Sequence, residues 1–150
     1  MTKMSRLVVV SLFLLPVSCA TVSHSGGGVE QVADWAAPPL HRAVSVRHGR
    51  TGEVLSFDAF LDALARADVV FLGETHIDET THRVELAVYE GLLVRRKGKV
   101  VLAMEMFERD VQPALDGYLA GRIDEAAFLS RARPWKNYRT GYRPLIEKAR

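Results

Sequence analysis

The chain has 150 residues, with 20 Lys and Arg against 18 Asp and Glu, and a single cysteine. One cysteine excludes an internal disulfide and the two-cysteine attachment motif of c-type haem. Two of the basic residues, Lys3 and Arg6, lie in residues 1–18, which contain no acidic residue, so residues 19–150 carry 18 of each sign. This balance leaves no basic stripe, and we expect no nucleic-acid partner.

Residues 1–18 are predicted to be a signal peptide. Two cations precede the apolar run 7–15, which is too short for a stable transmembrane helix. The small residues that follow lead to Cys19, in a pattern that resembles a bacterial lipobox, where the cysteine is lipidated and becomes the new N-terminus. Pro16 is unusual there, because Leu commonly stands three residues before the cysteine. An ordinary secretory signal with a chance cysteine is the alternative, and both export the chain from the cytoplasm.

Residues 19–39 are expected to form the lipidated N-terminus and a flexible tether, since they are rich in Ser and Gly and end at Pro38-Pro39. The globular domain is then 40–150. Residues 43–47 alternate like a strand, and a glycine-containing turn leads to Val54-Leu55. Ser56 is a suitable N-cap for a helix over 57–64, where apolar residues recur at helical spacing.

The next three segments predict a βαβ unit. The apolar run 69–73 is typical of a buried strand, and residues 78–96 have the periodicity of a long helix, with Gly98 at its C′ position. Residues 99–105 form a second near-continuous apolar strand, as expected of a parallel strand covered on both faces. The sequence therefore predicts an α/β fold with a mainly parallel sheet flanked by helices and a right-handed crossover.

The strand ends supply the candidate site. Parallel strands end at one edge of the sheet, where open α/β sheets bind ligands, so Glu74, His76 and Glu105 should converge. Two carboxylates and an imidazole suit a divalent metal that activates water, and these three residues are the candidate catalytic and metal-binding set. His82, on the first turns of the following helix, can face the same crevice. Ordinary structural roles remain open, among them an ion pair between Glu105 and Arg109.

Beyond the second strand, Asp110 is expected to cap a helix that has Pro113 in its first turn and ends by Gly121, and another helix begins at Asp124. The aromatic segments 134–138 and 142–145 either line a flat ligand or cover the core.

Five short segments then follow one another along the chain: Leu72-Gly73-Glu74-Thr75-His76, Glu105-Met106-Phe107, Gln112-Pro113-Ala114-Leu115, Tyr118-Leu119-Ala120-Gly121 and Tyr142-Arg143-Pro144. Together, from about residue 44 to the last residue, they resemble the ChaN-type family of iron-regulated, haem-binding lipoproteins. That family shares a superfamily with Tiki proteases, TraB-type proteins and erythromycin esterases.

The resemblance implies haem and iron uptake at the bacterial envelope, by a lipoprotein anchored in a membrane and facing the periplasm. It places the superfamily's metal or catalytic positions on Glu74, His76 and Glu105. It also implies haem as cofactor or cargo, held by His or Tyr ligation and aromatic stacking. The candidate haem-binding residues are His76, His82, Tyr118, Trp135 and Tyr142. A binding protein is expected rather than an enzyme; the alternative is a metal-dependent peptidase or esterase at the Glu74/His76/Glu105 edge.

Family members usually continue for roughly another hundred residues, about half a domain. Residues 40–150 are thus expected to be the N-terminal part of a larger α/β domain, with an exposed sheet edge. A remnant without function is a third interpretation, and a homodimer is left open.

Overall fold

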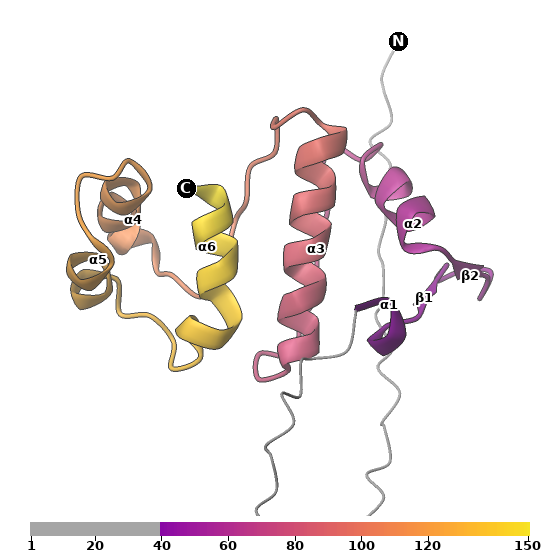
Figure 1. Cartoon of the computed structure of the whole chain (residues 1–150), viewed down its shortest axis with the longest axis horizontal. Coiled ribbons are helices and arrows are strands. Elements are labelled where there is room, and N and C mark those ends of the chain that lie inside the picture. Colours follow the sequence, from indigo (N-terminus) through magenta and orange to yellow (C-terminus); the bar gives the residue numbers. More distant parts are fainter. Residues whose placement is uncertain (1–39) are drawn as a thin grey trace, which may run out of the picture.

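The computed structural model describes residues 40–150, so the predicted signal peptide, Cys19 and the tether lie outside the described residues. The elements follow in this order: α1 (Leu40–Ala43), β1 (Val46–Arg47), β2 (Val54–Leu55), α2 (Phe57–Leu64), α3 (Glu79–Arg95), the 3₁₀ turn η1 (Arg109–Val111), α4 (Gln112–Leu119), α5 (Glu125–Ala132), the π-helical turn η2 (Tyr138–Tyr142) and α6 (Arg143–Ala149). Helix α3 is central, with α2 on one side and α6 on the other (Figure 1).

The described part opens with a small antiparallel hairpin. Val46 pairs with Leu55 and Arg47 with Val54. The expected strand over 43–47 is shortened to β1, because Ala43 is the last residue of α1. The predicted cap of α2 is confirmed, since the Ser56 hydroxyl accepts a 3.1 Å hydrogen bond from the amide of Ala59.

Helix α3 confirms the predicted helix over 78–96. The Asp78 carboxylate accepts hydrogen bonds from the amides of Thr80 and Thr81, at 2.7 and 3.3 Å, and so satisfies donors that the first turn leaves unpaired. At the other end Lys97 takes the left-handed conformation, with φ of 53°. The Gly98 amide then donates to the carbonyl of Leu93 at 2.7 Å. The helix ends in a Schellman motif in which Lys97, not Gly98, occupies C′.

Two apolar clusters hold the elements together. The first core joins α2, α3 and the hairpin, and consists of Val46, Phe60, Leu61, Leu64, Val84, Val88 and Leu92. The second core joins α4, α5, η2 and α6, and consists of Met106, Ala114, Tyr118, Phe128, Ala132, Tyr138, Tyr142 and Ile146. Close approach of α2 to α3 requires Gly91, because a methyl group there would lie 2.5 Å from the Leu61 side chain.

The predicted parallel sheet is absent from residues 40–150, and the fold is mixed helix with one two-stranded antiparallel sheet. Segments 69–73 and 99–105 contain no strand beyond a single bridge residue, Phe71. A parallel strand is stable when both its faces are covered, yet Phe71 is 68% and Val101 94% exposed. Residues 107–150 are mainly helical and supply no further strand. The crossover helix therefore forms, while the two segments that it should connect do not pair with each other within residues 40–150.

Candidate functional site

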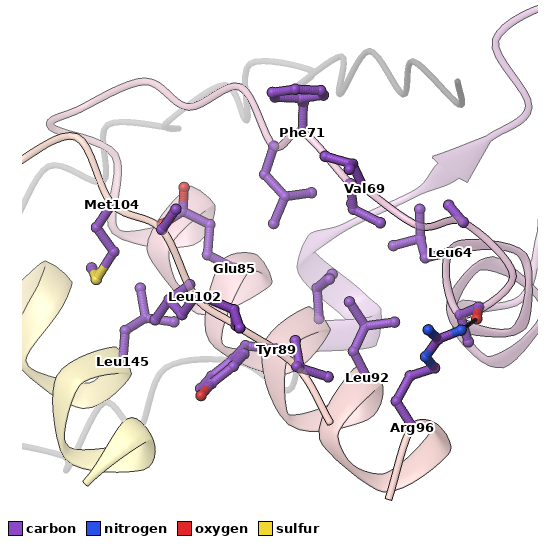
Figure 2. A pocket seen from close by; sticks show the side chains of 18 of the residues that line it. Leu64, Val69, Phe71, Glu85, Tyr89, Leu92, Arg96, Leu102, Met104 and Leu145 are labelled. Atoms are coloured by element: carbon purple, nitrogen blue, oxygen red, sulfur yellow. Dashed lines mark hydrogen bonds between the residues drawn. The ribbon is translucent and has the colours of Figure 1, made fainter. Parts of the chain in front are cut away.

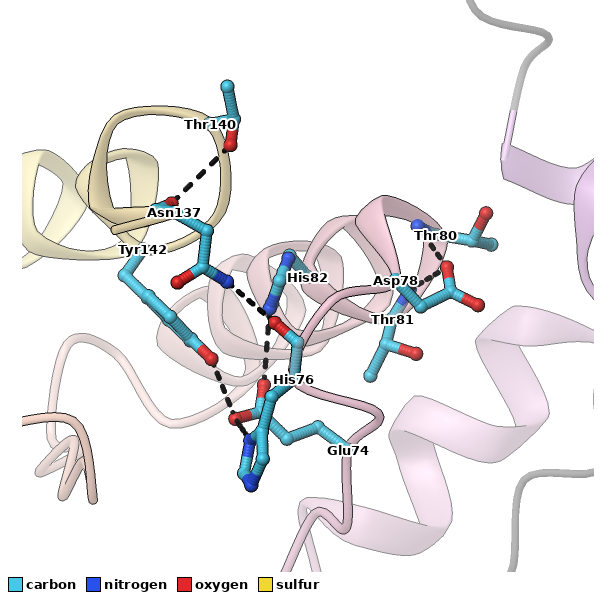
Figure 3. A network of polar contacts seen from close by, with 9 residues as sticks. All are labelled: Glu74, His76, Asp78, Thr80, Thr81, His82, Asn137, Thr140 and Tyr142. Carbon is cyan, nitrogen blue, oxygen red and sulfur yellow. Dashed lines mark hydrogen bonds and ion pairs between the residues drawn. The ribbon is translucent and has the colours of Figure 1, made fainter. Parts of the chain in front are cut away.

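Glu74 is the centre of the candidate site. It lies in the loop that leads into α3, and its side chain is only 12% exposed. One carboxylate oxygen, Oε1, lies 2.6 Å from His76 Nδ1 and accepts a 2.9 Å hydrogen bond from the Tyr142 hydroxyl. The other, Oε2, faces His82 Nε2 at 3.3 Å (Figure 3). Side chains from the loop, from α3 and from η2 thus converge on one carboxylate.

Local structure fixes these groups. The Asp78 cap sets the start of α3, which places His82 and Glu85 on one face, three residues apart. The His82 ring packs on Gly141, where an added methyl group would lie 2.8 Å from ring atoms. The Asn137 side-chain amide donates to the His76 carbonyl at 2.6 Å and ties the loop to the segment before η2.

The carboxyl groups of Glu74 and Glu85 differ in pKa because their surroundings differ. Burial by itself would raise the pKa of Glu74, but hydrogen bonds from His76 and Tyr142 outweigh it and lower that pKa. Burial, and then the neighbouring charge of Glu74, raises the pKa of Glu85 to about 8. Burial and the hydrogen bond to Glu74 raise the pKa of Tyr142 to about 12. At neutral pH the site therefore holds an ionised Glu74 beside a protonated Glu85.

Aromatic rings surround this centre. The rings of His76 and Trp135 meet edge to face, with centroids 5.0 Å apart, and those of His82 and Tyr142 do so at 4.6 Å. Trp135 also contacts Tyr142 edge to face at 5.9 Å. These contacts place the two histidines in a partly apolar setting.

A cavity of about 780 Å³ lies beside the site, between α3 and the two unpaired segments. Figure 2 shows the two segments beside one face of α3, with the Phe71 ring directed away from the helix. That face presents Glu85, Val88, Tyr89, Leu92 and Arg96. Glu85 and Arg96 are eleven residues apart, about 16 Å along the helix axis. The cavity has an acidic end near Glu74 and Glu85, apolar walls, and a basic end near Arg96.

The structure brings together most of the residues that the sequence singled out. Glu74, His76, His82, Trp135 and Tyr142 form the cluster described above.

Two sequence candidates lie apart from this cluster. Tyr118 belongs to the second core, stacked on Phe128 with its hydroxyl donating to Glu147. Glu105 is exposed and borders the cavity.

The sequence analysis missed two candidate functional residues, Glu85 and Tyr89. Glu85 interrupts the apolar face of α3, three residues after His82, and this break in periodicity was the signal for it. Tyr89 is 8% exposed and also lines the cavity. None of His76, His82, Tyr118, Trp135 and Tyr142 lines the cavity.

Within residues 40–150, no helix has the length and apolar character needed to span a membrane. Comparison with curated proteins gave no match, and neither did comparison with solved structures. A family model described as haem-binding uptake, Tiki superfamily, ChaN, matches residues 60–150, which include Glu74, the whole of α3 and the cavity lining from Leu64 onward. This chain therefore belongs to the ChaN family of haem-binding uptake proteins in the Tiki superfamily.

Proposed function

We propose that this protein binds haem in the cavity between α3 and the segments 67–72 and 99–106. The observation that carries the proposal is the cavity itself, in a chain of a haem-binding family. Its volume of about 780 Å³ lies within the range of about 300–1,000 Å³ typical of small-molecule and cofactor sites. Apolar side chains dominate its walls, as a porphyrin face requires.

The charged groups fit the polar edge of haem. Arg96 and Lys99 both line the cavity, near the end of α3. Haem carries two propionate carboxylates, and a guanidinium and an ammonium group are suitable partners for them. The Arg96 side chain is already oriented by a 3.0 Å hydrogen bond to the carbonyl of Ala65. We infer that the propionates lie at this end.

Tyr89, Met104 and Met106 line the cavity and offer side chains that are known haem-iron ligands. Among the described residues, no hydrogen bond engages the Tyr89 hydroxyl. Haem is cargo in this proposal, and bound iron would be carried rather than used for redox chemistry. The chain's own residues exclude water from the porphyrin and pair its carboxylates.

The cellular setting is part of the same proposal. A signal peptide over 1–18 and lipidation at Cys19 would place the domain at the bacterial envelope, facing the periplasm on a membrane anchor. The support is the charge and hydropathy pattern of residues 1–19, together with a family whose role is haem uptake. An exported, membrane-anchored domain that binds haem would serve in haem and iron uptake.

Haem titration followed in the Soret region tests the proposal. A saturable, shifted band at one haem per chain is expected. Tyr89→Phe removes one hydroxyl and should change the band position or weaken binding at least tenfold, if tyrosine is the ligand. Tyr118→Phe is the matched control, because Tyr118 is buried in the other core. Met104→Leu is the parallel variant. A band without saturation in the wild-type protein would contradict haem binding.

A metal-dependent hydrolase is the second candidate function. The observation that favours it is the convergence of histidines on the carboxylate of Glu74, which sequence reasoning assigned to a catalytic edge with His76 and Glu105. Hydrolysis of peptide or ester substrates that appears on adding a divalent metal, and disappears in Glu105→Gln, would support it. Metal-independent or absent hydrolysis would count against it.

A further inference from the structure

Three polar side chains converge beside the cavity. Ligand atoms of Glu74, His82 and Glu85 all lie within 4.8 Å of one another. Within residues 40–150, Glu74 Oε2 and both ring nitrogens of His82 have no hydrogen-bond partner, although Oε2 and Nε2 approach to 3.3 Å. His82 is 4% exposed. Leaving buried polar atoms unpaired is costly, so the arrangement needs an explanation.

We propose that Glu74, His82 and Glu85 together bind a divalent transition-metal ion. Imidazole nitrogen and carboxylate oxygen are ligands that Zn²⁺ and its neighbours accept, and three protein ligands leave an open position for water or substrate. Metal–ligand bonds of about 2.0–2.2 Å place the donor atoms of one ion roughly 3–3.5 Å apart. The observed set, within 4.8 Å, is wider than this, so metal binding requires the donor atoms to move inward. Two carboxylates also balance the charge of a divalent ion.

The surroundings hold the ligands as a metal site requires. Hydrogen bonds to Oε1 of Glu74, from His76 and Tyr142, fix that carboxylate and leave Oε2 directed at His82. Such outer contacts orient ligands in known metal sites. His82 and Glu85 sit on consecutive turns of a capped helix, so their spacing is rigid.

This ligand set differs from the one that sequence reasoning gave. His76 is 51% exposed and is engaged by Glu74 Oε1, while Glu105 is exposed on an unpaired segment. In the proposed ligand set His82 and Glu85 take the places of His76 and Glu105, because a spacing of three residues on α3 puts both side chains beside Glu74. The inference rests on this geometry and not on the haem proposal.

Zn²⁺ titration of EDTA-treated, extensively dialysed protein tests the site, with calorimetry as the readout and Co²⁺ absorption as a second probe. One saturable site is expected, and Glu85→Gln should weaken it at least tenfold. His82→Asn should do the same and should change the visible Co²⁺ spectrum, which reports loss of a nitrogen ligand. Glu90→Gln is the matched control, since Glu90 is an exposed acid on the same helix, paired with Lys148. It should change affinity less than twofold.

Two results would overturn the proposal. One is the absence of saturable binding to folded wild-type protein, with circular dichroism confirming the fold. The other is a tenfold loss in Glu105→Gln with Glu85→Gln unaffected, which would assign the metal to the Glu74/His76/Glu105 set. Haem titration of the His82→Asn protein keeps the two proposals separate, because His82 does not line the cavity and its loss should leave the Soret band of the haem complex in place.

Discussion

The Tyr142 hydroxyl donates a 2.9 Å hydrogen bond to the carboxylate of Glu74, a residue 68 positions earlier in the chain. Tyr142 is fully buried in the second core, so this bond joins that core to the loop before α3. It also keeps Glu74 ionised, because a hydrogen bond to the charged form lowers the pKa of the acid. The site is thereby held by packing in a different part of the molecule.

Tyr142→Phe should destabilise the protein. It keeps the ring and removes one hydrogen bond to a charged acceptor, a change that costs about 1.5–3 kcal/mol. Urea denaturation measures the free energy of unfolding. Tyr89→Phe is the control, because the Tyr89 hydroxyl bonds no other described residue, and a change within about 0.5 kcal/mol is expected. Equal stability of Tyr142→Phe and the wild type would mean that the bond does not connect the loop and the core.

Gly141→Ala should distort the site through the His82 ring. The added methyl group would lie 2.8 Å from ring atoms, closer than contact allows, and overpacking of this kind costs about 1–3 kcal/mol. Gly73→Ala is a matched control next to Glu74, because no atom lies within 4 Å of the methyl position there. Thermal denaturation should show a lower midpoint for the first variant and little change for the second. The reverse order would rule out the close packing of Gly141 on His82.

Stability should fall with rising pH because of Glu85. Its pKa is raised from 4.5 to about 8 by burial and by Glu74, so the folded protein binds more protons than the unfolded chain between these pH values. The free energy of unfolding therefore decreases as pH rises through that window. Glu85→Gln cannot lose a proton and should flatten this slope, whereas Glu90→Gln should retain it.

Urea denaturation at several pH values from 5 to 8, with EDTA present, measures the slope. Glu74 and His82 face Glu85, and both are kept in the two variants. A slope that is the same in Glu85→Gln and the wild type would place the pH dependence elsewhere.

Local signals in the sequence predicted the helices well. Ser56 caps α2 as expected, and Asp78 and Asp124, which were predicted only as helix starts, cap α3 and α5, because a side-chain oxygen next to an apolar periodic run specifies a helix start without help from distant residues. The expected cap by Asp110 is wrong, since α4 follows Val111 and has no side-chain cap. The apolar periodicity predicted both ends of α3 to within one residue. These features depend on neighbours in the chain, which the sequence displays directly.

The strands and the ligand set depend on distant residues and were harder to predict. An apolar run such as 69–73 specifies a strand only when another strand lies beside it, and residues 40–150 provide none in parallel. Without that pairing, Glu105 does not join the cluster at Glu74. Glu85 was missed because periodicity assigned its face of α3 to the core. The family resemblance made Tyr118 a haem-binding candidate, yet Tyr118 packs on Phe128 in the second core.

Blocking the cavity tests haem binding most directly. Leu102 is a half-buried residue of the cavity lining, and Leu102→Trp puts a large ring there. Val94→Trp is the control, because it puts the same ring on α3 at a position that is 77% exposed and outside the lining. Haem titration in the Soret region should show one saturable site in the wild type and in Val94→Trp, and binding at least tenfold weaker in Leu102→Trp. Equal haem binding by all three proteins would contradict the assignment of haem to this cavity.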